Sequence, residues 1–155
     1  MTYEEWLASM PSELTDDALW RMEVYRLAVF ASDLAWHDVS KLAKDKRTVS
    51  LSDQLYRAVG SIAANIAEGY SRRSGKDQAR FYEYGLGSAR EARGWYFQGR
   101  YVLSEAVAMH RIKLLTKIIR LLLTIIPSER GYRVREKRVI YDVSPRDLLD
   151  NPPMP

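Results

Sequence analysis

Cysteine is absent from this chain of 155 residues. A disulfide framework, a thiolate zinc site and a cysteine nucleophile are therefore excluded. Long apolar runs are absent as well: the longest, residues 114–126, is interrupted by Lys117 and Arg120 and falls short of the roughly 18 to 20 apolar residues of a membrane span. The N-terminus lacks the basic region and apolar run of a signal peptide. We therefore expect a soluble, cytoplasmic protein without a membrane partner.

Histidine is scarce, and the common catalytic motifs are missing. The two histidines are His37 and His110, and the chain contains no GxxxxGKS/T, GxGxxG, HExxH or GxSxG pattern. Asp33 and His37 would share a helical face, which invites a metal interpretation, but a di-metal bundle needs Glu-x-x-His motifs and none occurs. Hydrogen-bonded or exposed histidines are the favoured interpretation, and a metal-dependent enzyme is the weakest alternative. We expect no enzyme activity, no metal and no cofactor.

Positive charge is unevenly distributed along the chain. The formal net charge is +4, but the first 23 residues carry six acids and one arginine, which leaves +9 on the remainder. A basic body favours anionic partners, and nucleic acids are the commonest of these. A solvated surface that only aids solubility agrees equally well with the charge alone.

Hydrophobic periodicity predicts four long helices in an all-α chain. Their approximate ranges are 15–44, 50–69, 76–102 and 104–127. Because the loops between them are short, consecutive helices should run antiparallel, as in an up-down-up-down four-helix bundle. We expect this bundle over residues 15–127, an acidic N-terminal segment at 1–14 and an irregular, basic C-terminal tail at 128–155.

Capping and breaking residues suggest where these helices begin and end. Thr15, Ser50 and Ser74 can each cap a helix N-terminus. Gly69 has the residue type that commonly follows a helix C-terminus, and we place the end of the second helix there. Pro127 is placed at the end of the fourth helix.

The second predicted helix carries a polar strip and a face of small residues. The polar strip consists of Arg57, Ser61, Asn65 and Glu68. The strip has two interpretations: a hydrogen-bonded network that fixes the register of helices or subunits, or the lining of a polar site. We favour the network because no nucleophile or metal ligand accompanies the strip. The small residues are Gly60, Ala63, Ala64 and Ala67. Since glycine costs about 1 kcal/mol relative to alanine within a helix, Gly60 suggests close packing by another helix.

One side of the third predicted helix mixes basic and aromatic side chains. These are Tyr82, Arg90, Arg93, Phe97, Arg100 and Tyr101. Arginine can neutralise phosphate while rings stack on unpaired bases. The alternative is that the rings are core or interface residues and the arginines lay their stems along them. The opposite side, which includes Phe81 and Tyr96, is the predicted core face.

The fourth predicted helix is apolar over about 200°, twice the width that a surface helix needs. Such an arc implies two hydrophobic neighbours, and we expect self-association to supply the second. Lys113, Lys117 and Arg120 occupy the remaining face. With the basic residues of the other helices, loops and tail, the candidate nucleic-acid-binding residues are Arg72, Arg73, Arg90, Arg93, Arg100, Lys113, Lys117, Arg120, Arg133, Arg135, Lys137 and Arg138.

Residues 51–91 also carry a family resemblance. The order RA..SI..NIAEG, then a basic loop, then RF…GS..E resembles the proteins encoded in intervening sequences of bacterial 23S rRNA genes, sometimes called S23 ribosomal proteins. Weaker similarity extends over about residues 20–126. The resemblance implies an antiparallel four-helix bundle that commonly forms a ring-shaped homopentamer. It also implies a relation to the accessory variability protein of diversity-generating retroelements, a basic pentamer that associates with a reverse transcriptase and nucleic acid.

These patterns favour two functions. The first is a non-enzymatic homo-oligomer, with a pentamer favoured, that binds RNA or DNA through its basic surface as an accessory to a reverse transcriptase or to rRNA. The second is a protein-interaction scaffold that presents its tail to a partner protein and has no nucleic-acid role.

Overall fold

The structure, a computed structural model, describes residues 2–130 and 148–155. Within them every regular element is helical: α1 (Tyr3–Ala8), α2 (Ser12–Thr15), the 3-10 helix η1 (Ala18–Arg21), α3 (Glu23–Leu42), α4 (Val49–Tyr70), α5 (Gly75–Leu103) and α6 (Glu105–Arg130). No helix in these residues is long and apolar enough to cross a membrane. The all-α class predicted from the sequence is confirmed.

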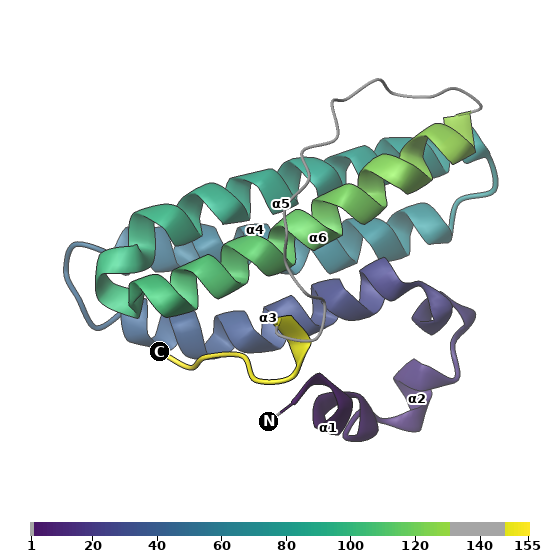
Figure 1. The fold of residues 1–155 in the computed structure, drawn as a ribbon. Helices are drawn as coiled ribbons and strands as arrows, with labels where there is room; N and C mark the ends of the chain where they lie inside the picture. The colour runs from purple at the N-terminus through teal and green to yellow at the C-terminus, as the bar shows by residue number, and fades with distance from the viewer. Residues whose placement is uncertain (1, 131–147) are drawn as a thin grey trace.

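The four long helices, α3 to α6, form a bundle (Figure 1). Each helix packs against the next one in the chain, and α6 also packs against α3, which closes the bundle. Each of the four buries an apolar stripe with helical spacing, such as Leu55, Val59, Ile62 and Ile66 on α4. The predicted helical bundle is therefore present within a single chain.

The first long helix begins later than its sequence suggests. We expected a start near Thr15, but α3 begins at Glu23, and the residues before it form α2 and η1. Asp17 caps η1 by accepting a hydrogen bond from the Leu19 amide at 2.8 Å. Met22 then has an extended backbone, which separates η1 from α3. The helix predicted to start near Thr15 is therefore interrupted, first by the Asp17 cap of η1 and then by the extended backbone at Met22.

The N-terminal segment is docked on the bundle through a tryptophan. Trp6 is 1% exposed, and its ring centroid lies 5.0 Å from that of Phe30 on α3. Its Nε1 donates a hydrogen bond of 2.5 Å to Asp33 Oδ2. This bond occupies one carboxylate oxygen of the Asp33 and His37 pair, and His37 itself is exposed. The segment that we identified only by its acidity therefore contributes to the core.

Gly69 does not end α4 as expected. It lies inside the helix, which continues to Tyr70, and it is buried. A Cβ at this position would lie 2.7 Å from Cε1 of Tyr82 on α5. The glycine permits the close approach of α5, and a left-handed C-terminal cap is not formed.

Of the three other predicted helix boundaries, at Ser50, Ser74 and Pro127, the structure confirms only Ser74. The Ser74 side chain accepts a hydrogen bond from the Asp77 amide at 3.2 Å, which confirms it as the N-cap of α5. Ser50 does not cap α4, because the helix already begins at Val49. Pro127 does not end α6, which runs three residues further, less than one turn, to Arg130.

The wide apolar arc of α6 is covered largely within the chain. Its buried residues are Leu114, Leu115, Ile118, Ile119, Leu122 and Ile126. They are buried because α6 has α5 on one side and α3 on the other, so the bundle itself supplies two neighbours. The width of the arc therefore does not require a second copy of the protein, which corrects the premise of that argument.

Candidate nucleic-acid interface

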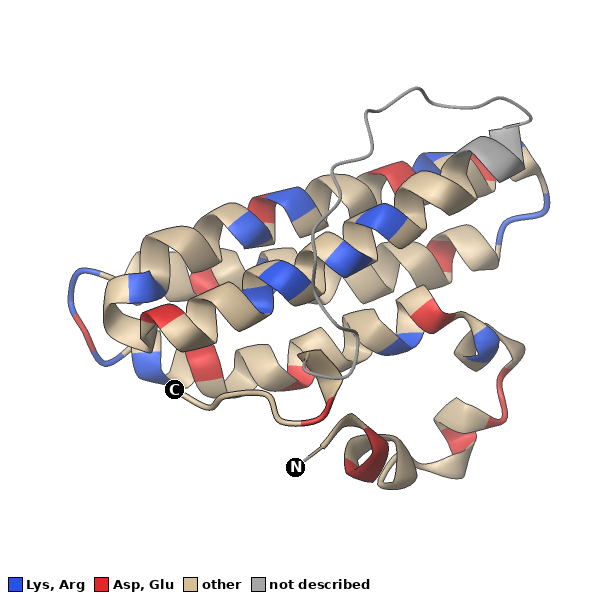
Figure 2. Cartoon of the chain, viewed as in Figure 1, with Lys and Arg blue, Asp and Glu red and all other residues tan. Residues whose placement is uncertain are grey.

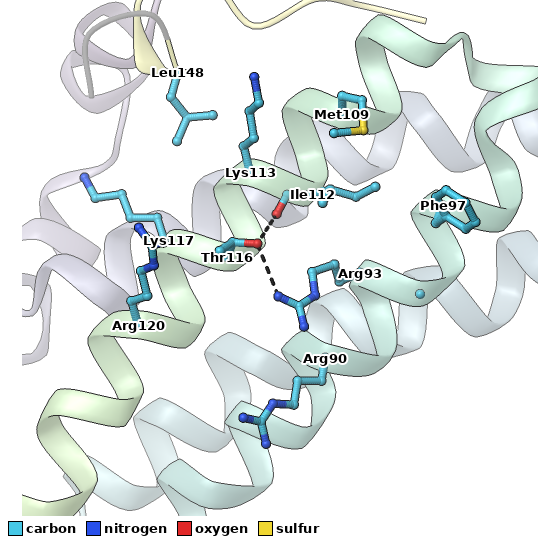
Figure 3. A pocket seen from close by; sticks show the side chains of 11 residues that line it. Arg90, Arg93, Phe97, Met109, Ile112, Lys113, Thr116, Lys117, Arg120 and Leu148 are labelled. Carbon is cyan, nitrogen blue, oxygen red and sulfur yellow. Dashed lines mark hydrogen bonds between the residues drawn. The ribbon is translucent and has the colours of Figure 1, made fainter. Parts of the chain in front are cut away.

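A groove of about 690 Å³ runs between α5 and α6. It is lined by Arg90, Arg93, Gly94, Phe97, Met109, Ile112, Lys113, Thr116, Lys117, Arg120 and Leu148 (Figure 3). Five of the twelve predicted nucleic-acid-binding residues lie here: Arg90, Arg93, Lys113, Lys117 and Arg120. They converge because each set recurs at intervals of three or four residues, which places its members on one face of its helix.

The two helices are linked at the groove by a polar contact. Arg93 Nη1 donates to Thr116 Oγ1 at 3.3 Å, and Thr116 Oγ1 in turn donates to the Ile112 carbonyl at 2.8 Å (Figure 3). These two hydrogen bonds hold the Arg93 guanidinium against α6. A cation positioned in this way loses less rotational freedom when it binds an anion.

The groove has a strongly positive lining. Among the described residues that line it there is no aspartate or glutamate. Lys113 is exposed, and basic residues repeat along α6 (Figure 2). Lys117 Nζ lies 2.7 Å from Glu23 Oε1 on α3, so its charge is partly compensated from outside the groove. Clustered like charges raise the local concentration of an anionic ligand.

Exposed aromatic rings continue the surface next to the groove. Phe97 lines the groove and is 54% exposed, and Tyr101, one turn further along α5, is 82% exposed. The Arg100 guanidinium lies 4.0 Å from the Phe97 ring centroid and 4.1 Å from that of Tyr101. Arg100 is therefore outside the groove lining but is held beside it by two rings.

Two aromatic assignments on α5 were interchanged. Tyr82, expected on the binding surface, is 3% exposed and packs against Gly69, where it belongs to the core. Phe81, expected in the core, is half-buried, and Arg72 and Arg80 lie over its ring. Tyr96, also on the predicted core face, is buried as expected, so the error is confined to these two adjacent positions, which lie about 100° apart on the helix.

The remaining predicted basic residues lie elsewhere. Arg72 and Arg73 are in the turn between α4 and α5, where Arg72 pairs with Glu68 and does not reach the groove. The other four, which are Arg133, Arg135, Lys137 and Arg138, fall outside the described residues.

The polar strip of α4 divides into separate contacts. Ser61 Oγ donates to Ser88 Oγ on α5 at 2.7 Å, and Asn65 Nδ2 donates to the Ser61 carbonyl at 2.8 Å. Arg57 pairs with Asp53 and Glu68 with Arg72, both on the exposed surface. Ser61 thus joins α4 to α5, Asn65 bonds within α4, and the outer two residues form pairs local to α4 and its C-terminal turn.

Gly60 does not serve close packing within the chain. It is exposed, and apart from its two chain neighbours and the adjacent α4 backbone no atom of the described residues lies within 4 Å of the position that its Cβ would take. Within the described residues, no other helix of the chain makes the close approach that we expected at Gly60.

A buried charged cluster escaped the sequence analysis. Arg111, 1% exposed, donates to Asp38 Oδ2 through Nε at 2.8 Å and to Oδ1 through Nη2 at 3.1 Å. Tyr96 donates its hydroxyl to Asp38 Oδ2 at 2.8 Å, and Arg111 Nη1 lies 2.9 Å from His110 Nδ1. The signal that could have found the cluster is a charged residue at an apolar position of the helical period, which holds for Asp38 on α3 and Arg111 on α6.

Burial changes the acidity of two groups in this cluster. Desolvation lowers the pKa of His110 to about 4, because the protonated ring would be removed from water and placed beside the Arg111 guanidinium. Desolvation and the Asp38 carboxylate raise the pKa of the Tyr96 hydroxyl well above its usual value. Both groups are thus neutral hydrogen-bonding partners of the ion pair at physiological pH. Across residues 2–130 and 148–155, no group of three or more acidic or histidine side chains could hold a metal ion.

Comparison with protein families gives one match. The family model described as 23S rRNA-intervening sequence protein matches residues 21–126, which is more than half of the chain and includes all of α3, α4 and α5 and most of α6. Comparison with curated proteins and with solved structures gives no match.

Proposed function

Because the chain belongs to the family of 23S rRNA-intervening sequence proteins, we propose that it is a non-enzymatic accessory protein that binds RNA through the groove between α5 and α6. One observation carries the proposal: five cationic side chains from two helices line a single groove. The family description associates these proteins with a ribosomal RNA sequence, which makes structured RNA the first candidate ligand.

Two kinds of contact are expected in such a complex. The groove cations would neutralise phosphates and release condensed counterions, so affinity falls steeply with salt and depends weakly on base sequence. Phe97 and Tyr101 offer exposed ring faces beside these cations, which suits stacking on unpaired bases. An RNA with a loop or bulge uses both contacts, whereas a regular duplex uses only the first.

We also propose that the protein assembles with copies of itself through α3 and α4, with a pentamer as the favoured state. Trp36 on α3 is 59% exposed, and its ring centroid lies 6.2 Å from that of Tyr56 on α4. Gly60, one turn further along α4, adds a surface without side-chain bulk. This face is opposite the α5 and α6 groove in the bundle, so assembly through it would leave the groove accessible.

The test is a fluorescence-anisotropy titration of the full-length protein against a stem-loop RNA, an unstructured RNA, a DNA duplex and a DNA single strand, at low and near-physiological salt. Salt-dependent binding that persists at the higher salt, with the stem-loop preferred over the duplex, supports the proposal. Absence of binding to all four at low salt contradicts it and favours a protein-interaction scaffold. If the protein binds RNA in this titration, the next experiment tests whether it also binds a complex of RNA and a reverse transcriptase.

A further inference from the structure

The C-terminal segment, residues 148–155, returns to the bundle and lies beside α3 and α6 (Figure 1). Leu148 is 4% exposed, and its carbonyl lies 2.6 Å from His110 Nε2. Further along the segment, Arg111 Nη2 donates to the Pro153 carbonyl at 2.9 Å. Two side chains of α6 thus hold two main-chain carbonyls of the segment.

The donors on α6 are oriented by the buried cluster. The bidentate contact with Asp38 fixes the Arg111 guanidinium and leaves an Nη2 hydrogen for Pro153. Arg111 Nη1 donates to His110 Nδ1, which requires that His110 carry its proton on Nε2, facing the Leu148 carbonyl. The site that holds the segment is therefore formed by side chains of α3 and α6, and the segment contributes carbonyl acceptors and apolar side chains.

The same residue, Leu148, also forms part of the lining of the basic groove. Of the described lining residues, Leu148 alone comes from outside α5 and α6. Its side chain lies beside Lys113, which is one turn beyond His110 on α6 (Figure 3). Whatever occupies the groove near Lys113 must therefore share that space with Leu148.

The charge of the segment opposes that of the groove. Residues 148–155, LLDNPPMP, contain Asp150 and no lysine or arginine, and Asp150 is exposed. The docked segment therefore places an apolar side chain, Leu148, in the lining of a cationic groove and adds no positive charge that would attract an anionic ligand. Its hold on the bundle consists of two main-chain hydrogen bonds, the buried Leu148 and Pro152, and the half-buried Leu149.

We propose that residues 148–155 are an autoinhibitory latch: docked on His110 and Arg111, they occlude the groove at Leu148, and their release admits nucleic acid. The proposal rests on the RNA-binding function proposed above. A latch closed in about nine-tenths of the molecules raises the apparent Kd about tenfold, because only the open fraction binds.

The test compares full-length Leu148→Asn with full-length Met154→Asn. Leu148→Asn removes the anchor, whereas Met154 is 52% exposed and makes a matched control in the same segment. Anisotropy with the stem-loop RNA should give a Kd several-fold lower for Leu148→Asn and an unchanged Kd for Met154→Asn. A synthetic peptide of sequence LLDNPPMP, added in trans, should weaken RNA binding by Leu148→Asn.

The possible failures are distinguishable. Equal RNA affinity of the wild type and Leu148→Asn would overturn the latch and leave the RNA-binding function intact. Lack of RNA binding by both proteins at low salt would overturn the RNA-binding function and the latch with it. Thermal melts followed by circular dichroism check that both variants keep the helical bundle.

Discussion

At the scale of single residues, the buried ion pair between Asp38 and Arg111 is the feature on which stability depends most sharply. Both side chains are almost completely removed from water, at 0% and 1% exposure. Such a pair contributes little net stability compared with an apolar pair, but loss of one partner leaves a buried charge without compensation. Its members are also hydrogen-bonded to Tyr96 and His110, so the whole cluster depends on both charges.

Arg111→Met is therefore expected to lower the free energy of unfolding by about 3 to 5 kcal/mol. Adding Asp38→Asn removes the uncompensated charge and keeps an acceptor for the Tyr96 hydroxyl, so the double variant should recover part of the loss. Urea unfolding followed by circular dichroism measures both. Arg57→Met, which breaks an exposed pair with Asp53, should leave the urea midpoint unchanged. An Arg111→Met variant as stable as the wild type would contradict this account of the cluster.

His110 gives stability a specific pH dependence. Its pKa is lowered from 6.5 to about 4 in the folded state, so between these values the unfolded chain binds a proton that the folded chain does not. Stability from this group is thus fully present above pH 6.5 and falls as the pH is lowered toward 4, by an amount on the order of 3 kcal/mol. Urea midpoints measured from pH 7 to pH 4 should fall less steeply for His110→Gln. The control is His37→Gln, at an exposed position on α3, whose urea midpoint should change with pH as that of the wild type does. The same pH dependence of the urea midpoint in the wild type, His110→Gln and His37→Gln would contradict a lowered pKa of His110.

At the scale of single elements, two glycines of α4 have opposite surroundings. Gly60→Ala places a methyl group in open space and should raise stability by about 0.5 to 1 kcal/mol, since alanine favours the helix. Gly69→Ala places a methyl group 2.7 Å from the Tyr82 ring and should lower stability by about 1 to 3 kcal/mol. Thermal unfolding of the two variants compares them directly, and a stabilising Gly69→Ala would refute the close approach of α5.

The sequence predicted those features of the elements that depend on local patterns. The Ser74 cap follows from spacing within a few residues and is confirmed, and the same kind of spacing places Arg90 and Arg93 on one face of α5 and Lys113, Lys117 and Arg120 on one face of α6. Gly69 also carries a local signal, but contact with Tyr82 gives that glycine a different role.

Long-range contacts could not be predicted in this way. Asp38 and Arg111 are 73 residues apart, and no periodicity within α3 or α6 indicates that they meet. Trp6 bonds to Asp33 across 27 residues, and Leu148 meets His110 across 38. These pairs arise from the packing of α1, α3, α6 and the C-terminal segment. The latch and the buried cluster therefore became visible only in the structure.

At the scale of the whole molecule, the proposed assembly face and the groove make separate predictions. Trp36→Glu places a charge on the exposed ring pair of α3 and α4 and should shift sedimentation-velocity profiles from the oligomer to the monomer. Tyr101→Glu, at an exposed ring on α5, is the matched control and should sediment as the wild type does. A wild type that sediments as a monomer at high concentration, or an oligomer unaffected by Trp36→Glu, would contradict assembly through this face.

Charge reversal in the groove and charge reversal in a turn together separate binding at the groove from a general effect of net charge. Lys113 lies in the groove, whereas Lys46 is an exposed lysine in the turn between α3 and α4. Reversal of either charge changes the net charge of the protein equally. Only Lys113→Glu removes a contact within the proposed binding surface.

The most direct measurement is the salt dependence of stem-loop RNA affinity for the wild type, Lys113→Glu and Lys46→Glu, determined by fluorescence anisotropy. RNA binding in the groove predicts that Lys113→Glu binds more weakly, with the slope of log K against log salt reduced by about 0.7 to 0.9 for the lost phosphate contact. Lys46→Glu should retain the wild-type slope. Identical slopes and affinities for Lys113→Glu and Lys46→Glu would contradict the assignment of the groove as the RNA-binding surface.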